Sequence, residues 1–201
     1  EIILKTISSL DQIAGRVGAM ELDNHISIDP TQAGLLQKRK FCQENCIRLA
    51  SSIKKNSVNH ANNRNFLMLD MEDSSVTDDT IDLCSILADM DLPVAVTLQA
   101  CLFRTKDDMA ALIKKACAIR LVKGAFAENS QISLTRKKDI DMQYLALADN
   151  MLEAARINNH FYPVFATHDK NMIDRINTMT EKYAIPPADY EFEMLFGVKQ
   201  N

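Results

Sequence analysis

The 201-residue sequence contains no tryptophan, and none of its apolar runs approaches the length of about 18 to 20 residues that a membrane-spanning helix requires. No secretory signal precedes its first apolar segment. Its 23 lysines and arginines are outnumbered by 27 aspartates and glutamates, which gives a net charge of −4. That balance argues against a nucleic-acid-binding protein, because such proteins need clustered positive charge.

Several sequence signatures of catalysis and cofactor binding are also missing. The glycine fingerprint G-x-G-x-x-G of dinucleotide-binding proteins is absent, and only five glycines occur in the chain. No serine lies in a glycine-flanked elbow, and no cysteine lies beside a plausible base. The five cysteines are odd in number and fall mostly in helix-like segments, which predicts reduced thiols in a reducing compartment.

What the sequence does contain is a series of short apolar runs, each of which ends at a polar or charged residue. Such runs have the length of strands, and a helix-like segment follows each one. Repeated strand–helix units build a parallel sheet with its chemistry at the carboxyl ends of the strands. The runs and their endings are 2–4 before Lys5, 66–69 before Asp70, 94–98 before Gln99, 119–122 before Lys123, and 162–166 before Thr167.

A sixth strand is expected over residues 190–195, and the fold class is therefore α/β. Six strand–helix units do not close an eight-stranded barrel, which typically needs about 250 residues. A complete open sheet and a barrel without its last two units both fit this pattern. The remaining expectations are an irregular segment over 11–29, helices over 30–55, from 77, from 105, over 140–158 and over 170–183, and a loop over 56–64.

Arg120 lies inside one of these strand-like runs, where alternation places its side chain on the same side as that of Val122. A guanidinium that points into a barrel or toward a cofactor must be paired. Asp70, at another strand end, is an available partner. A buried structural salt bridge is the alternative interpretation.

Lys123, Gly124 and Ala125 begin a loop in which glycine allows the backbone to approach a ligand closely. Backbone N–H groups in such a loop could bind a phosphate or a ring carbonyl. An ordinary tight turn is the alternative.

Thr167 and His168 follow a buried strand and can donate hydrogen bonds to anionic oxygens. A purely structural histidine is the alternative interpretation. Asp169 can cap the helix that follows.

The acidic segment 70–73 raises the question of a metal site, since hard cations prefer carboxylate oxygens. In an extended segment Asp70 and Glu72 share one face, whereas Asp73 points away. No second acidic cluster marks another strand end, and no metal is therefore expected.

Taken together, five segments of the chain resemble proline dehydrogenase, the flavoenzyme family that oxidises L-proline. They occur in the family's order and at compatible spacings from Asp70 to the end of the chain, whereas the first 65 residues match loosely. The segments are LDMED (69–73), LQACLFRT (98–105), RLVKGAF (120–126), ATHD (166–169) and FEMLFGV (192–198).

The resemblance implies a (β/α)8 TIM-like barrel of the proline dehydrogenase type, here with about six βα units, and FAD across the strand ends. It implies oxidation of proline to Δ1-pyrroline-5-carboxylate, a step of proline catabolism toward glutamate, by hydride transfer to flavin N5. Electrons would then pass to a quinone. The implied location is the cytoplasm, with peripheral association at the inner membrane (mitochondrial in a eukaryote).

The resemblance also implies roles for individual residues. Asp70 matches the acidic active-site residue, and Arg120 matches the arginine beside flavin N5. Lys5, at the end of the first apolar run, is similar to the lysine that meets the substrate carboxylate. The implied FAD contacts are Met71, Gln99, Lys123, Gly124, Ala125, Thr167 and His168.

These roles make physical sense. Arg120 can stabilise negative charge that develops on reduced flavin, and Lys5 can fix the position of the proline carboxylate before reaction. We expect Asp70 to orient the cationic groups around it, and a role as general base for the substrate amine is the alternative.

The sequence also departs from the family pattern. Members carry two further strand units and a last helix with a Tyr-x-x-Arg-Arg motif, which does not occur here, and Phe126 replaces a common tyrosine. We expect residues 1–201 to be a single catalytic barrel domain and a fragment of a longer chain. Two alternatives stay open: a truncated flavin-binding paralogue without turnover, and an unrelated metal-dependent barrel enzyme that uses Asp70 and Glu72.

Overall fold

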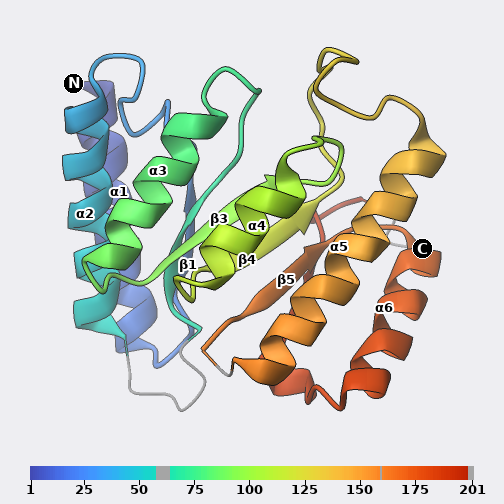
Figure 1. Ribbon diagram of the computed structural model, residues 1–201. Coiled ribbons are helices and arrows are strands. Elements are labelled where there is room, and N and C mark those ends of the chain that lie inside the picture. Colours follow the sequence, from blue (N-terminus) through green and yellow to red (C-terminus); the bar gives the residue numbers. More distant parts are fainter. Residues whose placement is uncertain (58–63, 159, 199–201) are drawn as a thin grey trace. The chain divides into compact units, whose positions relative to one another are not determined.

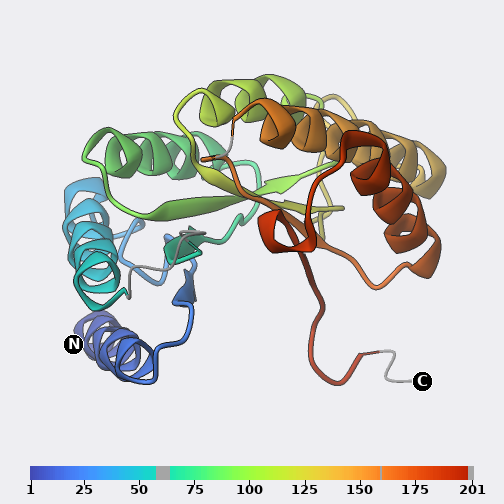
Figure 2. The same ribbon diagram turned by 90° about the horizontal axis from the view of Figure 1, so that it is seen from below.

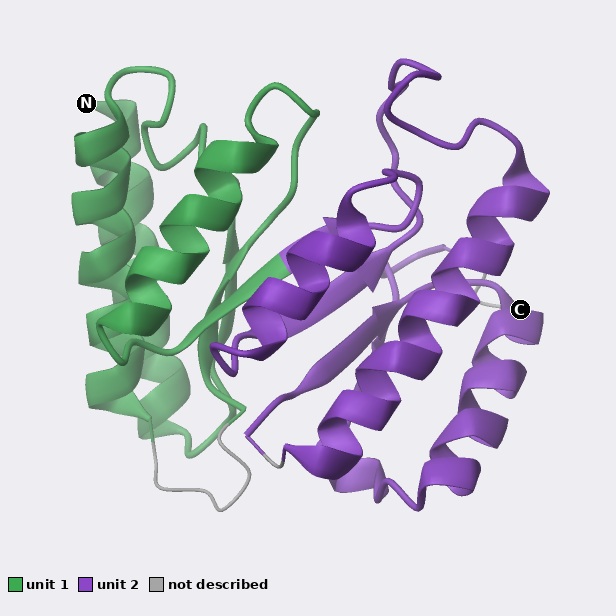
Figure 3. Cartoon of the chain, viewed as in Figure 1, with its two compact units in different colours: residues 1–96 green, residues 97–201 purple. Residues whose placement is uncertain are grey.

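The computed structural model describes residues 1–57, 64–158 and 160–198. The chain divides into two compact units, Glu1–Val96 and Thr97–Asn201 (Figure 3). Within the described residues, helices alternate with six strands, and five of the six predicted strand segments are confirmed. No helix in this described part combines the length and hydropathy of a membrane-spanning segment.

The described residues of unit 1 form three helices, two complete strands and the start of a third, all parallel (Figure 1). Residues 25–28 pair with 66–69, so the first two strands end level, whereas Leu69 pairs with Val96 and the third strand continues to Gln99. The second and third strands are buried along their whole length, as expected for a parallel sheet covered on both faces. The elements are α1 (Ile2–Ala19), β1 (His25–Ile28), α2 (Arg39–Asn56), β2 (Phe66–Leu69), α3 (Thr77–Asp89) and β3 (Val94–Gln99).

The N-terminal predictions are wrong. Residues 2–4 belong to α1 rather than to a strand, because the buried Ile7 and Ala14 continue the apolar pattern at helical spacing. The first strand is β1, which lies in the segment predicted to be irregular. The helix expected over 30–55 begins only at Arg39, after a series of turns. Most of the loop predicted over 56–64 lies outside the described residues.

Unit 2 contains the end of β3 and three further parallel strands, which are neighbours in chain order. Helices α4 and α5 pack against these strands, and α6 packs beside α5 (Figures 1 and 2). The predicted helices and strands of this half are confirmed within a few residues. They are α4 (Thr105–Ile113), β4 (Ala118–Val122), α5 (Lys137–Ile157), β5 (Pro163–Ala166), α6 (Lys170–Tyr183), the 3-10 turn η1 (Pro187–Asp189) and β6 (Glu191–Glu193).

Tyr144 of α5 connects the carboxyl ends of β4 and β5. Its side chain is fully buried, and its hydroxyl lies 3.1 Å from the Leu121 carbonyl oxygen and 3.3 Å from that of Ala166. The single O–H donor is therefore shared between the two strands. Burial raises the pKa of Tyr144, which keeps the hydroxyl protonated as a donor.

We expect Tyr144→Phe to lower the free energy of unfolding by about 1 to 2 kcal/mol, because a buried hydrogen bond to two strand carbonyls is lost. Urea unfolding followed by circular dichroism measures the change. Tyr183→Phe is the matched control: its hydroxyl interacts with Lys182 at an exposed site, so its effect should stay within about 0.5 kcal/mol. Equal stabilities of the two variants would contradict this role of Tyr144.

Candidate active site

A cavity of about 280 Å³ opens at the carboxyl ends of the strands in unit 2. Its walls come from β4, from the residues that follow β5, and from β6 with the residues after it. We call it the Arg120 cavity. It is lined by Arg120, Val122, Ala166, Thr167, His168, Glu193, Met194 and Leu195.

Strand register brings these residues together. Leu121 pairs with Phe165, and Ala166 pairs with Glu193, so the ends of the three strands are level. Leu121 is fully buried, whereas Arg120 and Val122 are only partly buried and line the cavity, as alternation along β4 predicts. The sequence therefore placed the Arg120 side chain correctly.

Arg120 forms an ion pair with Glu193. Its Nε lies 2.8 Å from the Glu193 carboxylate, and the two side chains are 16% and 30% exposed. The expectation that this guanidinium must be paired is confirmed. Glu193 belongs to the FEMLFGV segment, and the sequence alone predicts no role for it. Its position at the end of a strand, like that of Asp70, was the signal that could have identified it.

Thr167 and His168 lie between β5 and α6. The Thr167 backbone N–H donates to the Glu193 carbonyl oxygen at 3.2 Å, which continues the pairing of β5 with β6. His168 Nε2 accepts a hydrogen bond from the Leu195 N–H at 3.1 Å, so Nδ1 carries the proton of the neutral imidazole. Nδ1 is buried, and no partner for it occurs among the described residues. The predicted cap is confirmed, since the Asp169 side chain accepts from the Asn171 N–H.

Gly124 adopts a backbone conformation that suits glycine, with φ at +105°. A Cβ at this position would lie 2.4 Å from Cys101 Sγ and 3.1 Å from Gln99 Oε1. The loop backbone therefore lies directly against the buried Gln99 side chain, at 2% exposure. Two predicted cofactor contacts are thus neighbours in space, whereas Ala125 next to them is exposed.

The Lys123 side chain takes part in an ion-pair network beside this loop. Its Nζ lies 2.6 Å from Asp141 and 3.3 Å from Asp169, and Lys137 also pairs with Asp141. Burial opposes ionisation of Asp141, but hydrogen bonds from the two lysines outweigh it and lower its pKa. The Lys123 ammonium is thus held by carboxylates, which leaves the loop backbone as the group that could meet a ligand.

Unit 1 collects carboxylates at the ends of its first two strands. Asp29 follows β1 and Asp70 follows β2, and the Asp70 N–H donates to the Ile28 carbonyl oxygen at 3.0 Å. Glu72 accepts from the Thr31 N–H at 3.1 Å and from its hydroxyl at 2.7 Å. Burial, together with the charges of Glu72 and Asp70, raises the pKa of Asp29.

Met71 lies between these acids and is 8% exposed. Thr31 engages both oxygens of Glu72, so this arrangement gives the metal-dependent alternative no support.

Lys5 does not lie at the end of a strand. It lies in the first turn of α1, its side chain is 75% exposed, and it pairs with Glu1 at 3.0 Å. The strand-end argument for substrate binding by Lys5 is therefore wrong. The residue that follows the first strand is Asp29, of opposite charge. The short alternation of Ile26 and Ile28 with polar residues was the only sequence signal for that strand.

We expect Asp29→Asn to increase the free energy of unfolding at pH 7. The raised pKa means that the folded protein binds a proton more tightly than the unfolded chain, so ionisation of Asp29 destabilises the fold. Wild-type stability should therefore rise relative to the variant as pH falls through the folded pKa toward 3.8, and the difference should vanish below it. Urea unfolding between pH 3.5 and 7.5 measures the difference.

Asp73→Asn is the matched control with the opposite sign. Hydrogen bonds from Ser75 lower the Asp73 pKa, so this variant should be less stable than wild type at pH 7 and should approach it in acid. A stability difference for Asp29→Asn that does not depend on pH would contradict the assignment.

Comparison with known proteins gives a consistent result. The family model described as proline dehydrogenase matches residues 4–201. Proline dehydrogenase 2 of Bacillus subtilis (strain 168) is 29% identical over 188 residues, which are 94% of this chain and 58% of that protein. Proline dehydrogenase of Deinococcus radiodurans is 31% identical over 138 residues, which are 68% of this chain and 43% of that protein.

The fold is also similar to that of solved structures. Proline utilization A (PutA) from Bdellovibrio bacteriovorus matches with a TM-score of 0.80 at 19% identity, over 98% of this chain and 24% of that one. This confirms the predicted α/β fold of the proline dehydrogenase type. The chain spans 58% of the length of the Bacillus relative. Because the family model covers nearly all of its residues, the chain belongs to the proline dehydrogenase family.

Proposed function

We propose that this chain is part of an FAD-dependent enzyme that oxidises L-proline to Δ1-pyrroline-5-carboxylate. The observation that carries the proposal is the Arg120 cavity, where a largely buried guanidinium lies with Thr167 and His168 at the carboxyl ends of parallel strands. Membership of the proline dehydrogenase family supports the substrate.

Two features of unit 2 fit FAD. The missing side chain of Gly124 leaves room for the loop backbone to lie against Gln99, and backbone N–H groups in such loops bind phosphates or ring carbonyls. The buried Nδ1 of His168 is a donor whose partner is not among the described residues. The residues that would hold FAD in this unit are Gln99, Lys123, Gly124, Ala125, Thr167 and His168.

When bound, FAD supplies the acceptor for the hydride that leaves proline as its C–N bond becomes C=N. Arg120, whose side chain is 16% exposed, would provide positive charge where negative charge accumulates on the reduced cofactor. For Asp70 and Met71 of unit 1 we propose the roles that the family resemblance implies, an acidic active-site residue and an FAD contact.

We also propose an electron acceptor and a cellular location for this protein. A quinone would take the electrons from the reduced cofactor, and the protein would work in the cytoplasm or at the surface of the inner membrane. The family resemblance supports these assignments.

The test is to purify the longest natural chain that contains these residues and to add FAD and then L-proline without oxygen. We expect a yellow protein whose flavin absorbance near 450 nm disappears on addition of L-proline but not of D-proline. A colourless protein that takes up no FAD would contradict the proposal. Stoichiometric FAD that proline never bleaches would instead identify a flavin-binding paralogue without turnover.

We expect Gly124→Ala to weaken FAD binding at least tenfold, because the new methyl group would collide with Cys101 Sγ and strain a backbone at φ +105°. Titration of flavin fluorescence measures the affinity, and a thermal melt checks that the variant is folded. Gly15→Ala is the matched control, since nothing lies within 4 Å of the added Cβ. Equal affinities for the two variants would remove the loop from the FAD site.

A further inference from the structure

Glu193 brings a negative charge into the Arg120 cavity. Its carboxylate lies 2.8 Å from Arg120 Nε, and both residues line the cavity. The contact is fixed by the backbone, because Glu193 pairs with Ala166 and its carbonyl oxygen accepts from the Thr167 N–H. A flexible surface pair would not be held in this way.

The ion pair changes what the cavity offers to a ligand. An arginine without a counter-charge would present a full positive charge, whereas the pair is close to neutral at a distance. The Glu193 carboxylate approaches the guanidinium at Nε, at 2.8 Å. A negative charge at this distance attenuates the field of Arg120 in the cavity.

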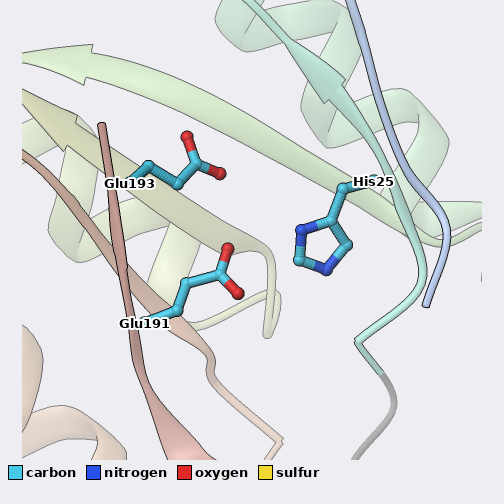
Figure 4. Close-up of side chains that lie close together, drawn as sticks. All are labelled: His25, Glu191 and Glu193. Atoms are coloured by element: carbon cyan, nitrogen blue, oxygen red, sulfur yellow. The ribbon is translucent and has the colours of Figure 1, made fainter. Parts of the chain in front are cut away.

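β6 carries a second carboxylate for comparison. Glu191 lies two residues before Glu193, and Figure 4 shows both side chains on the same side of the strand. Its carboxylate lies 3.2 Å from the Tyr162 hydroxyl, and it is not among the residues that line the cavity. A carboxylate oxygen of Glu191 lies within 4.8 Å of one of Glu193, so the two charges are close together, but only Glu193 is among the residues that line the cavity.

We propose that Glu193 is a positioning residue that orients Arg120 and attenuates its charge, and thereby holds the reduction potential of the bound flavin low. This inference rests on the proposed FAD site. Reduction adds negative charge to the cofactor, and a carboxylate in the cavity wall opposes that charge. A lower potential favours transfer of electrons onward to the acceptor.

The test measures the two-electron midpoint potential of the FAD-loaded protein by reductive titration against a reference dye. Glu193→Gln keeps the size of the side chain and one oxygen at its end but removes the charge. We expect it to favour the reduced flavin about tenfold, which is a positive shift of about 30 mV for a two-electron couple. Glu193→Asp restores the charge one methylene further back and should return most of the shift.

Asp189→Asn is the control, because it removes a charge of the same sign from the exposed turn η1 before β6, outside the cavity. A large shift for Glu193→Gln with a small one for Asp189→Asn supports the proposal. No shift for Glu193→Gln, or equal shifts for both variants, overturns it. If Glu193→Gln does not fold, Glu193→Ala replaces it, because it also removes the charge: a positive shift supports the proposal, and an unchanged potential overturns it.

Failure of this inference can be told from failure of the proposed function. A wild-type protein that takes up FAD and is bleached by L-proline keeps the function even where the potentials of the variants do not move. A wild-type protein that binds no FAD loses both.

Discussion

The candidate site in unit 2 depends on the register of three short parallel strands. Hydrogen bonding of β5 to β4 and β6 pairs Arg120 with Val164 and Glu193 with Ala166, two residues further along β5, so both side chains lie on one face near the strand ends. Successive side chains of a strand point to opposite faces, so a slip of β6 by one residue would carry the Glu193 side chain away from Arg120. The pairing of the strand backbones therefore decides which side chains meet in the cavity.

The loop after β4 shows the same dependence on the backbone. Gly124 is required both by its positive φ and by the closeness of Cys101, while Lys123 is anchored through Asp141 and Asp169. The ion pairs of Lys123 and the close packing of Gly124 together fix the position of the loop backbone beside Gln99. A ligand at this point would meet backbone donors in a fixed position, which is the usual way proteins bind phosphates and ring carbonyls without a dedicated charge.

The sequence predicted those parts of the molecule in which one periodicity runs over many residues. Helix α6 was placed at its observed bounds, and β2 was found because four consecutive apolar residues are bounded by polar ones. The prediction for the first 40 residues was wrong because no long periodic pattern is evident there. The three apolar residues at the start of α1 resemble a strand unless the helical spacing to Ile7 is taken into account. The strand β1 has only two buried residues, so its alternating pattern is short.

The candidate site was predictable to a similar degree. Alternation along β4 sufficed to orient Arg120, and the need to pair a buried guanidinium was plain from its chemistry. Its partner Glu193 was not predictable in the same way, because it lies 73 positions later and only the strand pairing makes the two neighbours. Lys5 was assigned through an apparent strand, and its position changed once that strand became a helix.

The most direct test of this account is a crystal structure, with FAD bound, of the longest natural chain that contains these residues. The account predicts that the isoalloxazine ring contacts the Arg120 guanidinium while Glu193 still holds Nε, and that the 123–125 backbone and His168 touch the same cofactor. An FAD molecule bound away from the carboxyl ends of β4 and β5, or a ring without contact to Arg120, would contradict it.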